Sequence, residues 1–424
     1  MGMRRRFGVA VIAALGLTMT LSACKARVDI GTQAALSPEQ QAAQIERGRY
    51  LAIAGDCAAC HTRAGGEAFA GGRGLETPFG VIYAPNITPD KQTGIGNWST
   101  ADFRRALHHG QDDEGKNLYP AFSYPYYARV TDEDVDAIHA YINSLTPVSY
   151  TAPKNGLGFP FNIRLSLKGW NLLHFRSGVF KPTAGKSAEW NRGAYLVEGL
   201  GHCGACHTPK NIMGGDKNGQ RLQGGVLEGW FASDLTGDKK TGLGNWTEQD
   251  IVDFLKTGAN THSSAYGGMA EVVRLSTSKM TDEDLKAMAV YLKSQPAPTS
   301  RPTSLAPSAA VMAQGKALYD KGCADCHVDD GSGIPGLYPP LAANANVNAH
   351  DPSSILQIVI DGSGHPDNPA AFGEGMAAFP TLKNADVAAV ATYIRNSWGN
   401  KASPVIARQA GEMRAMVNAR KKDK

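Results

Sequence analysis

Cys57-Ala-Ala-Cys60-His61 is the stretch that decides the fold, and its pattern occurs three times in this chain of 424 residues. The other two copies are Cys203-Gly-Ala-Cys206-His207 and Cys323-Ala-Asp-Cys326-His327. Together the copies use six of the seven cysteines and leave only Cys24 outside the pattern. This arithmetic indicates one chemical site repeated three times rather than scattered thiols.

The Cys-x-x-Cys-His motif is typical of covalent haem attachment, in which both thiols add across the vinyl groups and the histidine binds the iron. A structural zinc site needs four ligands, usually as two separated pairs. A thioredoxin-like centre needs a βαβ pattern that this sequence lacks, and a disulfide needs no histidine. We therefore expect three covalently bound haem c groups. Their thioether cysteines are Cys57, Cys60, Cys203, Cys206, Cys323 and Cys326, and their iron ligands are His61, His207 and His327.

The second axial ligand of each iron sets its redox behaviour. Methionine opposite histidine raises the reduction potential, whereas an open position admits small molecules. We expect Met269, in Gly-Gly-Met-Ala-Glu, to serve the second site, and Met376, in Gly-Met-Ala-Ala-Phe-Pro, to serve the third. Met280 and Met288 compete with Met269. However, Met288 lies on the apolar stripe of a predicted helix, and Met280 comes directly before a helix cap.

The first site lacks a methionine anywhere between residues 61 and 131. Where a ligand loop is expected, residues 118–125 read Leu-Tyr-Pro-Ala-Phe-Ser-Tyr-Pro, with Phe122 at its centre. Either the first haem is five-coordinate, or another side chain binds its iron. The histidine candidates are His108, His109 and His139, and each such residue is more often a surface histidine than a ligand.

The first two motifs lie in two copies of one domain. Residues 47–51, Arg-Gly-Arg-Tyr-Leu, correspond to 192–196, Arg-Gly-Ala-Tyr-Leu. Thr-Gly-x-Gly-Asn-Trp ends at both Trp98 and Trp246, and Thr-Asp-Glu-Asp begins at both Thr131 and Thr281. The nearly constant spacing between these matches indicates an internal duplication. The third unit is shorter and lacks the Gly-Asn-Trp element.

Changes in composition divide the chain into segments. The predicted order is a signal peptide (1–23), a lipidated tether (24–43), domain 1 (44–150), an aromatic connecting segment (151–187), domain 2 (188–294), a Pro-rich linker (295–309), domain 3 (310–400) and a basic tail (401–424). Ser37-Pro38 predicts the start of a helix, and Thr131 and Thr281 predict N-caps of further helices. The fold prediction is mainly α, with long Gly/Pro-rich loops and a haem completing each thin core.

The N-terminus predicts export. Arg4, Arg5 and Arg6 precede an apolar run that is slightly short for a transmembrane helix, and Leu21-Ser-Ala-Cys24 resembles a bacterial lipobox. An acylated Cys24 would hold the protein on the periplasmic side of the bacterial inner membrane. The alternative is an ordinary signal peptide. The net charge of +4 is concentrated at the chain ends, so the core between them is mildly acidic, which argues against nucleic-acid binding.

Two long repeats followed by a shorter unit resemble the three-haem cytochrome c subunits of bacterial membrane-bound dehydrogenases. Three elements carry this resemblance: Leu118-Tyr-Pro-Ala, Gly-Gly-Met269-Ala-Glu-Val-Val273 and Thr-Gly-x-Gly-Asn-Trp. The resemblance covers nearly all of residues 40–400. It implies three tandem class-I-like cytochrome c domains that relay electrons to ubiquinone or a terminal respiratory acceptor such as another cytochrome. The electrons come from a catalytic subunit, a quinoprotein, flavoprotein or molybdoprotein with a small accessory subunit, that oxidises an alcohol, aldehyde or sugar.

Two features depart from that family. Phe122 stands where many relatives have methionine, and a lipobox occurs where relatives often attach by a C-terminal amphipathic segment. No catalytic residue is predicted, because no Gly-rich flavin or nicotinamide fingerprint follows a strand. Two alternatives stay open: a stand-alone peroxidase- or reductase-like multihaem enzyme with an open first haem, or a lipid-tethered carrier that feeds an oxidase.

Two further segments have open interpretations. The aromatic connecting segment either packs the first two domains together or forms a docking surface. The basic tail is either a surface helix attracted to anionic lipid or a solvated end.

Overall fold

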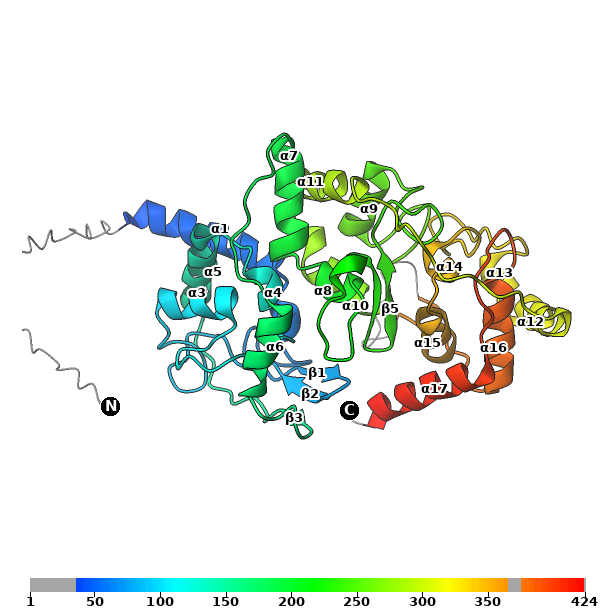
Figure 1. Ribbon diagram of the computed structural model, residues 1–424, viewed down its shortest axis with the longest axis horizontal. Helices are drawn as coiled ribbons and strands as arrows, with labels where there is room; N and C mark the ends of the chain where they lie inside the picture. The colour runs from blue at the N-terminus through cyan, green and yellow to red at the C-terminus, as the bar shows by residue number, and fades with distance from the viewer. Residues whose placement is uncertain (1–35, 365–374, 423–424) are drawn as a thin grey trace, which may run out of the picture.

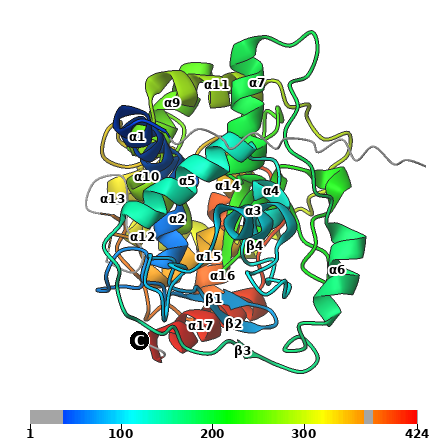
Figure 2. The ribbon, with the colours of Figure 1, turned by 90° about the vertical axis from the view of Figure 1, so that its left-hand side faces the viewer.

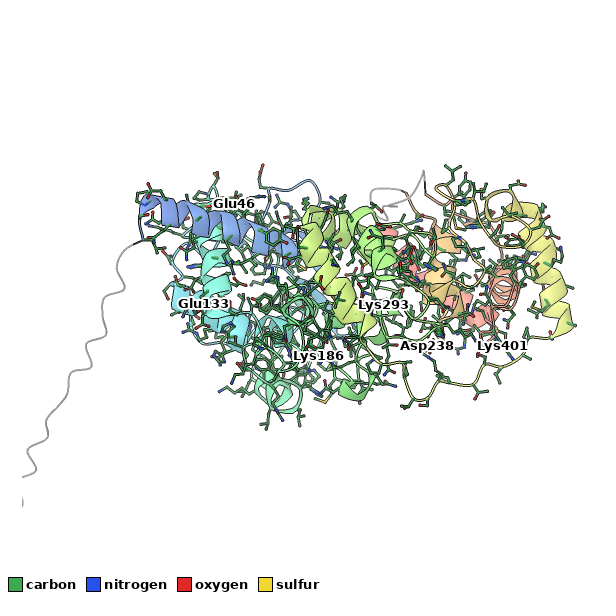
Figure 3. The ribbon with its side chains drawn as sticks, turned by 90° about the horizontal axis from the view of Figure 1, so that it is seen from above. Glu46, Glu133, Lys186, Asp238, Lys293 and Lys401 are labelled. Carbon is green, nitrogen blue, oxygen red and sulfur yellow. The ribbon has the colours of Figure 1, made fainter. Side chains whose placement is uncertain are left out.

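A computed structural model describes residues 36–364 and 375–422 of the chain. Three helical units follow one another in chain order along the long axis of an elongated molecule (Figure 1). Seen from above, Glu46 and Glu133 lie in the first unit, Lys293 and Asp238 in the second, and Lys401 in the third (Figure 3). The predicted mainly α fold is confirmed. None of the helices in the described ranges combines the length and the apolarity needed to cross a membrane.

The first two units share one plan. The first contains α1 (Pro38–Ala54), α2 (Cys57–His61), β1 (Gly74–Thr77), β2 (Gly80–Tyr83), α3 (Thr100–His109), α4 (Tyr124–Tyr127) and α5 (Asp132–Ser144). The connecting segment adds β3 (Gly156–Leu157) and α6 (Ser166–His174). The second unit contains α7 (Ala188–Tyr195), η1 (Leu196–Leu200), α8 (Gly204–His207), η2 (Asn218–Gln220), β4 (Gln223–Leu227), β5 (Trp230–Asp234), α9 (Glu248–Thr257), α10 (Gly267–Leu275), η3 (Thr277–Lys279) and α11 (Asp282–Lys293).

The third unit keeps the helical plan without a named strand in its described part. It contains α12 (Ala309–Gly322), α13 (Ala324–His327), α14 (Ala345–Asn348), α15 (Ser353–Asp361), α16 (Asn384–Ile394) and α17 (Ala407–Lys422). The hairpins of the first two units are antiparallel: β2 pairs with both β1 and β3, and β4 pairs with β5. These strands were not predicted from the sequence.

Helix starts follow the sequence signals. The Ser37 side chain accepts a hydrogen bond from the Gln40 backbone, which forms a capping box before α1. Thr131 and Thr281 cap α5 and α11 through their side-chain oxygens. The predicted N-caps are therefore confirmed.

In every unit the N-terminal helix crosses the last helix of its core at a glycine. A Cβ atom at Gly48 of α1 would lie 1.7 Å from the carbonyl oxygen of Ala137 in α5. A Cβ at Gly193 would lie 1.9 Å from the Ala287 carbonyl oxygen. Gly315 occupies the corresponding place in the third unit. Glycine thus lets the two helices meet backbone to backbone.

We expect Gly48→Ala to lower the free energy of unfolding by about 3 kcal/mol, because α1 and α5 must separate to admit the methyl group. Chemical denaturation of the purified holoprotein, followed by circular dichroism, measures this change. Gly169→Ala in α6 is the matched control, since a Cβ there meets nothing within 4 Å. Equal stability of the two variants would contradict the backbone contact.

The first two units are fused by one hydrophobic core. Buried side chains from α1 and α5 and from α7 and α11 belong to the same cluster, which includes Leu51, Ile142, Leu196 and Leu285. The third unit has a separate cluster, which includes Tyr319, Leu356 and Val387. The molecule therefore consists of a fused pair of units and a third unit with its own core.

Reciprocal hydrogen bonds cross the boundary inside the fused pair. The Tyr195 hydroxyl of the second unit donates to Asp134 of the first at 2.6 Å. The Tyr50 hydroxyl of the first unit donates to Asp284 of the second, also at 2.6 Å. Each aspartate is also paired with an arginine of its own unit. The duplicated elements thus meet in a pseudo-two-fold arrangement, in which each copy makes the same contact to the other.

Hydrogen bonds join the third unit to the second. The Phe231 backbone N–H donates to Ser354 Oγ at 2.9 Å, and Ser233 Oγ donates to Asn346 Oδ1 at 2.7 Å. Both contacts join β5 to the third unit. The second and third units share no hydrophobic cluster among the described residues, so this joint differs from the core that fuses the first two units.

The basic tail forms a helix on the surface of the third unit. One face of α17 is buried in the core of that unit, through Ala410, Met413 and Val417. A merely solvated end is therefore wrong for the helix. Ile406 and Met416 are exposed, so attraction of the outer face to anionic lipid stays a prediction.

Candidate functional site

The three Cys-x-x-Cys-His motifs occupy equivalent places in the fold. Each follows the N-terminal helix of its unit and coincides with a short helix, α2, α8 or α13. None of the six motif cysteines is paired in a disulfide. Every unit therefore presents two cysteines and one histidine on a single turn.

One ring nitrogen of each motif histidine is held by a backbone carbonyl. Nδ1 lies 2.8 Å from the Pro85 oxygen in His61, 2.6 Å from the Ser233 oxygen in His207 and 3.2 Å from the Pro339 oxygen in His327. A carbonyl oxygen only accepts hydrogen bonds, so Nδ1 must carry the proton and Nε2 the lone pair.

The environment of these rings favours the neutral form that binds a metal. Burial lowers the pKa of His61, His207 and His327 alike. Within the described ranges, no hydrogen bond holds Nε2 of any of the three rings. A carbonyl that fixes the tautomer and orients the ring is the usual support of a metal-binding histidine.

In the first two units the hairpin regions supply the carbonyl groups, a role that sequence reasoning missed. Pro85 lies two residues after β2, and Ser233 lies within β5. A Cβ at Gly225 of β4 would lie 2.5 Å from the Cys206 carbonyl oxygen, so this hairpin contacts the second motif backbone to backbone. The glycine-rich stretch was the signal that the sequence offered, because glycine in a strand often marks a close backbone approach.

The thiols do not resemble a redox-active disulfide centre. Burial raises the pKa of Cys57 to about 12 and that of Cys206 to about 11. Reactive cysteines have a lowered pKa instead. The described part of the chain also holds no cluster of three or more His, Cys, Asp or Glu residues suited to a metal ion. Paired thiols with one free imidazole nitrogen fit covalent haem better than either alternative.

The methionine candidates occupy different environments. Met269 lies on α10, partly buried against the fused core and a small neighbouring cluster. Met376 packs against the core of the third unit, and its backbone N–H donates to Ser363 Oγ at 2.9 Å. The competitors Met280 and Met288 are fully buried in the fused core. Met269 and Met376 stay our predicted iron ligands.

The histidine candidates for the first iron are engaged or exposed. His108 is buried, with Nε2 at 2.9 Å from the Val130 carbonyl oxygen. The His139 ring stacks on Phe103 and lies within hydrogen-bond reach of Thr100. His109 faces solvent. These contacts favour a first haem without a histidine as its sixth ligand.

Phe122 lies at the place of the expected methionine. Its ring packs against Tyr127 at 5.4 Å between centroids and borders the fused core. Tyr127 in turn donates a hydrogen bond to the carbonyl oxygen of Gly55, directly before the first motif. The 118–125 loop is therefore tied to the first motif without offering a methionine sulfur.

A partly buried ion pair joins the first motif to the second unit. Arg73 Nη1 donates to the Ala59 carbonyl oxygen at 2.6 Å and to Glu271 of α10 at 2.8 Å. Beside this pair, burial raises the pKa of Asp56 to about 8, and one of its carboxylate oxygens has no hydrogen-bond partner. The first Cys-x-x-Cys-His motif thus lies next to α10, the helix of the second unit that carries Met269. Sequence reasoning missed these residues, because no pattern marks them.

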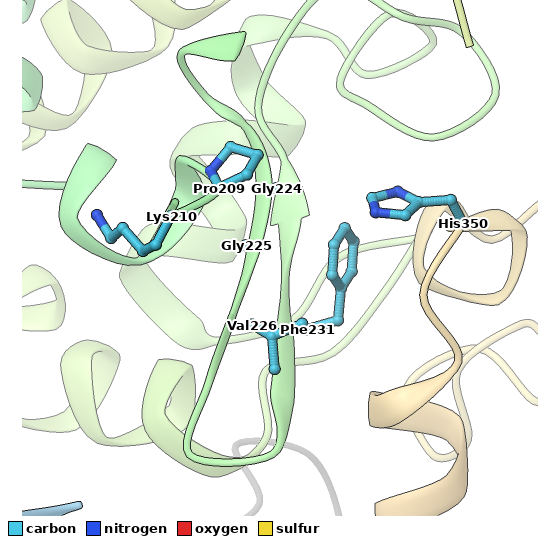
Figure 4. Close-up of a pocket in the computed structure, with 7 residues that line it drawn as sticks. All are labelled: Pro209, Lys210, Gly224, Gly225, Val226, Phe231 and His350. Atoms are coloured by element: carbon cyan, nitrogen blue, oxygen red, sulfur yellow. The ribbon is translucent and has the colours of Figure 1, made fainter. Parts of the chain in front are cut away.

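A cavity lies where the second and third units meet. It has a volume of about 200 Å³ and is lined by Pro209, Lys210, Gly224, Gly225, Val226, Phe231 and His350. Figure 4 shows the Phe231 and His350 side chains approaching each other, and their ring centroids lie 5.1 Å apart. The third unit therefore packs on the hairpin that holds His207.

Comparisons with known proteins agree with this geometry. The family model described as Cytochrome c matches residues 45–146 and 312–398, in the first and third units. The chain is 39% identical to the alcohol dehydrogenase (quinone) cytochrome c subunit of Gluconacetobacter polyoxogenes, over 91% of this chain and 87% of that protein. It is 41% identical to the gluconate 2-dehydrogenase cytochrome c subunit of Pantoea cypripedii, over 88% and 90%. The chain belongs to the family of dehydrogenase cytochrome c subunits.

A further relative extends the family. A nicotinate dehydrogenase subunit of Pseudomonas putida is 40% identical over 95% of this chain, which spans only 34% of that protein. Membership in the dehydrogenase cytochrome c subunit family establishes tandem cytochrome c domains, covalently bound haem c and an electron-transfer role. The predicted family resemblance is thereby confirmed. The predicted acylation site, Cys24, lies outside the described residues.

Proposed function

We propose that this chain carries three c-type haems and relays electrons from a membrane-bound dehydrogenase to ubiquinone or another cytochrome. The observation that carries the proposal is the same carbonyl-held imidazole in all three motifs. Haem iron supplies the one-electron redox chemistry, and the protein sets its potential through axial ligands and burial. The relatives' names support a catalytic dehydrogenase as the electron donor.

The residues of the chain hold and orient the redox centres. Pro85, Ser233 and Pro339 fix the three histidine rings through their carbonyl oxygens. The fused core keeps the first two sites at a constant separation, and β5 joins the second site to the third unit. An electron path through all three units therefore needs no rearrangement inside the fused pair.

The partner and the location complete the proposal. The donor is a quinoprotein, flavoprotein or molybdoprotein subunit that oxidises an alcohol, aldehyde or sugar. The lipobox-like ending at Cys24 supports a tether on the periplasmic side of the inner membrane. The relatives do not favour the stand-alone peroxidase- or reductase-like enzyme.

Purification of the tagged chain from membranes of its native host tests this function. We expect a catalytic dehydrogenase subunit to copurify, and its substrate to reduce the haems of the complex within one turnover. Haem reduction is followed by absorption spectroscopy. A chain that copurifies with no dehydrogenase and that itself turns over peroxide or nitrite would overturn the proposal.

A further inference from the structure

An exposed apolar surface covers the outer side of the connecting segment. Its members are Phe159, Phe161, Ile163, Leu165, Leu172 and Leu173, which we call the 159–173 surface. Phe159 is 82% exposed, Leu172 is 74% and Leu165 is 68%. Large apolar side chains gathered at such exposure on one segment mark an interaction site rather than scattered surface residues.

The two faces of α6 differ sharply. The inner face packs on the protein: the Trp170 indole donates to the Met213 carbonyl oxygen at 2.9 Å, and Tyr124 meets the Phe175 ring at 5.0 Å. The outer face carries Leu165, Leu172 and Leu173. In Figure 2 this helix stands at the margin of the molecule, with no other element over its outer side. The segment thus packs the first two units together and also leaves one face uncovered.

The loop that α6 contacts extends the apolar surface. Ile212 is 96% exposed and Met213 is 45% exposed. Because Trp170 binds the backbone of Met213, this loop is held beside α6. The surface is therefore built on two segments that a hydrogen bond joins.

The segment that carries these apolar side chains is positively charged. Residues 146–187 contain six Lys or Arg residues and no Asp or Glu. Of these cations, Lys154, Lys168 and Lys181 are exposed and form no ion pair with any described residue. Arg164 pairs with Asp112 at 3.6 Å. On the outer face of α6, Lys168 lies between Leu165 and Leu172 at helical spacing.

We infer that the 159–173 surface binds the interface of a bilayer that contains anionic phospholipid. Lys and Arg beside Leu, Phe and Trp on a short amphipathic element are typical of interfacial membrane binding. Free lysines attract acidic headgroups, and the apolar side chains enter the boundary with the acyl chains. Protein interfaces instead deplete lysine from their centres. This contact is separate from the predicted lipid at Cys24 and does not depend on the electron-transfer role.

Vesicle flotation of the full-length holoprotein tests the inference. In the parent protein, a cleavable export signal without a lipobox replaces residues 1–24, which removes both the predicted acylation and the apolar run of the predicted signal peptide. We expect this protein to float with vesicles of phosphatidylcholine and phosphatidylglycerol in equal parts, and weakly with phosphatidylcholine alone. Adding Leu172→Glu and Leu173→Glu should lower binding to the mixed vesicles at least about tenfold, because two apolar contacts are lost and two negative charges face acidic lipid.

Leu305→Glu is the matched control, since Leu305 is an equally apolar residue, 68% exposed, in the linker. It should bind like the parent protein. If the Leu172→Glu, Leu173→Glu protein lacks a native haem spectrum, Lys168→Glu replaces it and should weaken binding to the anionic vesicles. Equal flotation of parent and variant would overturn the inference. Unchanged flotation with loss of a copurifying dehydrogenase would assign the surface to that protein instead.

Discussion

Replacing both Cys323 and Cys326 with serine is expected to yield a chain with two covalent haems instead of three. Without thioether bonds the third haem is not retained, and the third unit loses the centre of its thin core. The first two units should stay folded, because their core contains no residue of the third unit. Mass spectrometry of the intact chain counts the haems, and limited proteolysis reports which units stay protected.

The matched change, Cys203→Ser with Cys206→Ser, should have a wider effect. Cys57 and Cys203 both pack against the fused core, so loss of the second haem disturbs both units. We expect protease cuts in the first as well as the second unit. Damage confined to the second unit would contradict the fused core. Retention of three haems by the Cys323→Ser, Cys326→Ser chain would contradict haem attachment at that motif.

We expect Phe122→Met to supply a sixth ligand to the iron of the first haem. The reduced parent should bind about one carbon monoxide per chain, because neither His108 nor His139 is free to act as sixth ligand. Methionine is apolar, flexible and somewhat smaller than phenylalanine, so the loop should accept it at a modest cost in stability. A thioether opposite histidine raises the potential of that haem. We expect carbon monoxide binding to fall to near zero and the potential to rise.

Optical titration with carbon monoxide and a potentiometric titration measure these two changes. Phe122→Leu serves as the control, since it alters the same apolar contact with Tyr127 without supplying sulfur. It should bind carbon monoxide like the parent. If the reduced parent binds no carbon monoxide, another side chain must be the sixth ligand of the first iron. The five-coordinate interpretation would then be wrong.

Much of the fold follows from local sequence. Ser37, Thr131 and Thr281 predict helix starts because a cap is a contact between neighbours in the chain. The duplication predicted that the first two units share a plan, and the structure shows equivalent glycines at both helix crossings. The motif itself predicted the haem-binding residues because its chemistry needs only five consecutive positions.

The remaining features depend on contacts between distant residues. The carbonyl partner of His207 lies on β5, and the hairpins were missed because their strands are short and glycine-rich. Tyr50 reaches Asp284 across 234 positions, which no local pattern reveals. The packing of the tail was not predicted, because the burial of Met413 and Val417 depends on the third unit, and a basic sequence alone does not show that partner.

The contrast between the fused core and the polar joint has a kinetic consequence. On the proposed function, two redox centres held by one hydrophobic core keep their separation unless that core breaks, so we expect transfer between them to need no conformational change. The joint to the third unit includes hydrogen bonds such as that from the Phe231 N–H to Ser354, and no hydrophobic cluster of the described residues spans it. If a conformational change controls the rate of electron transfer, we therefore expect it at the step between the second and third units.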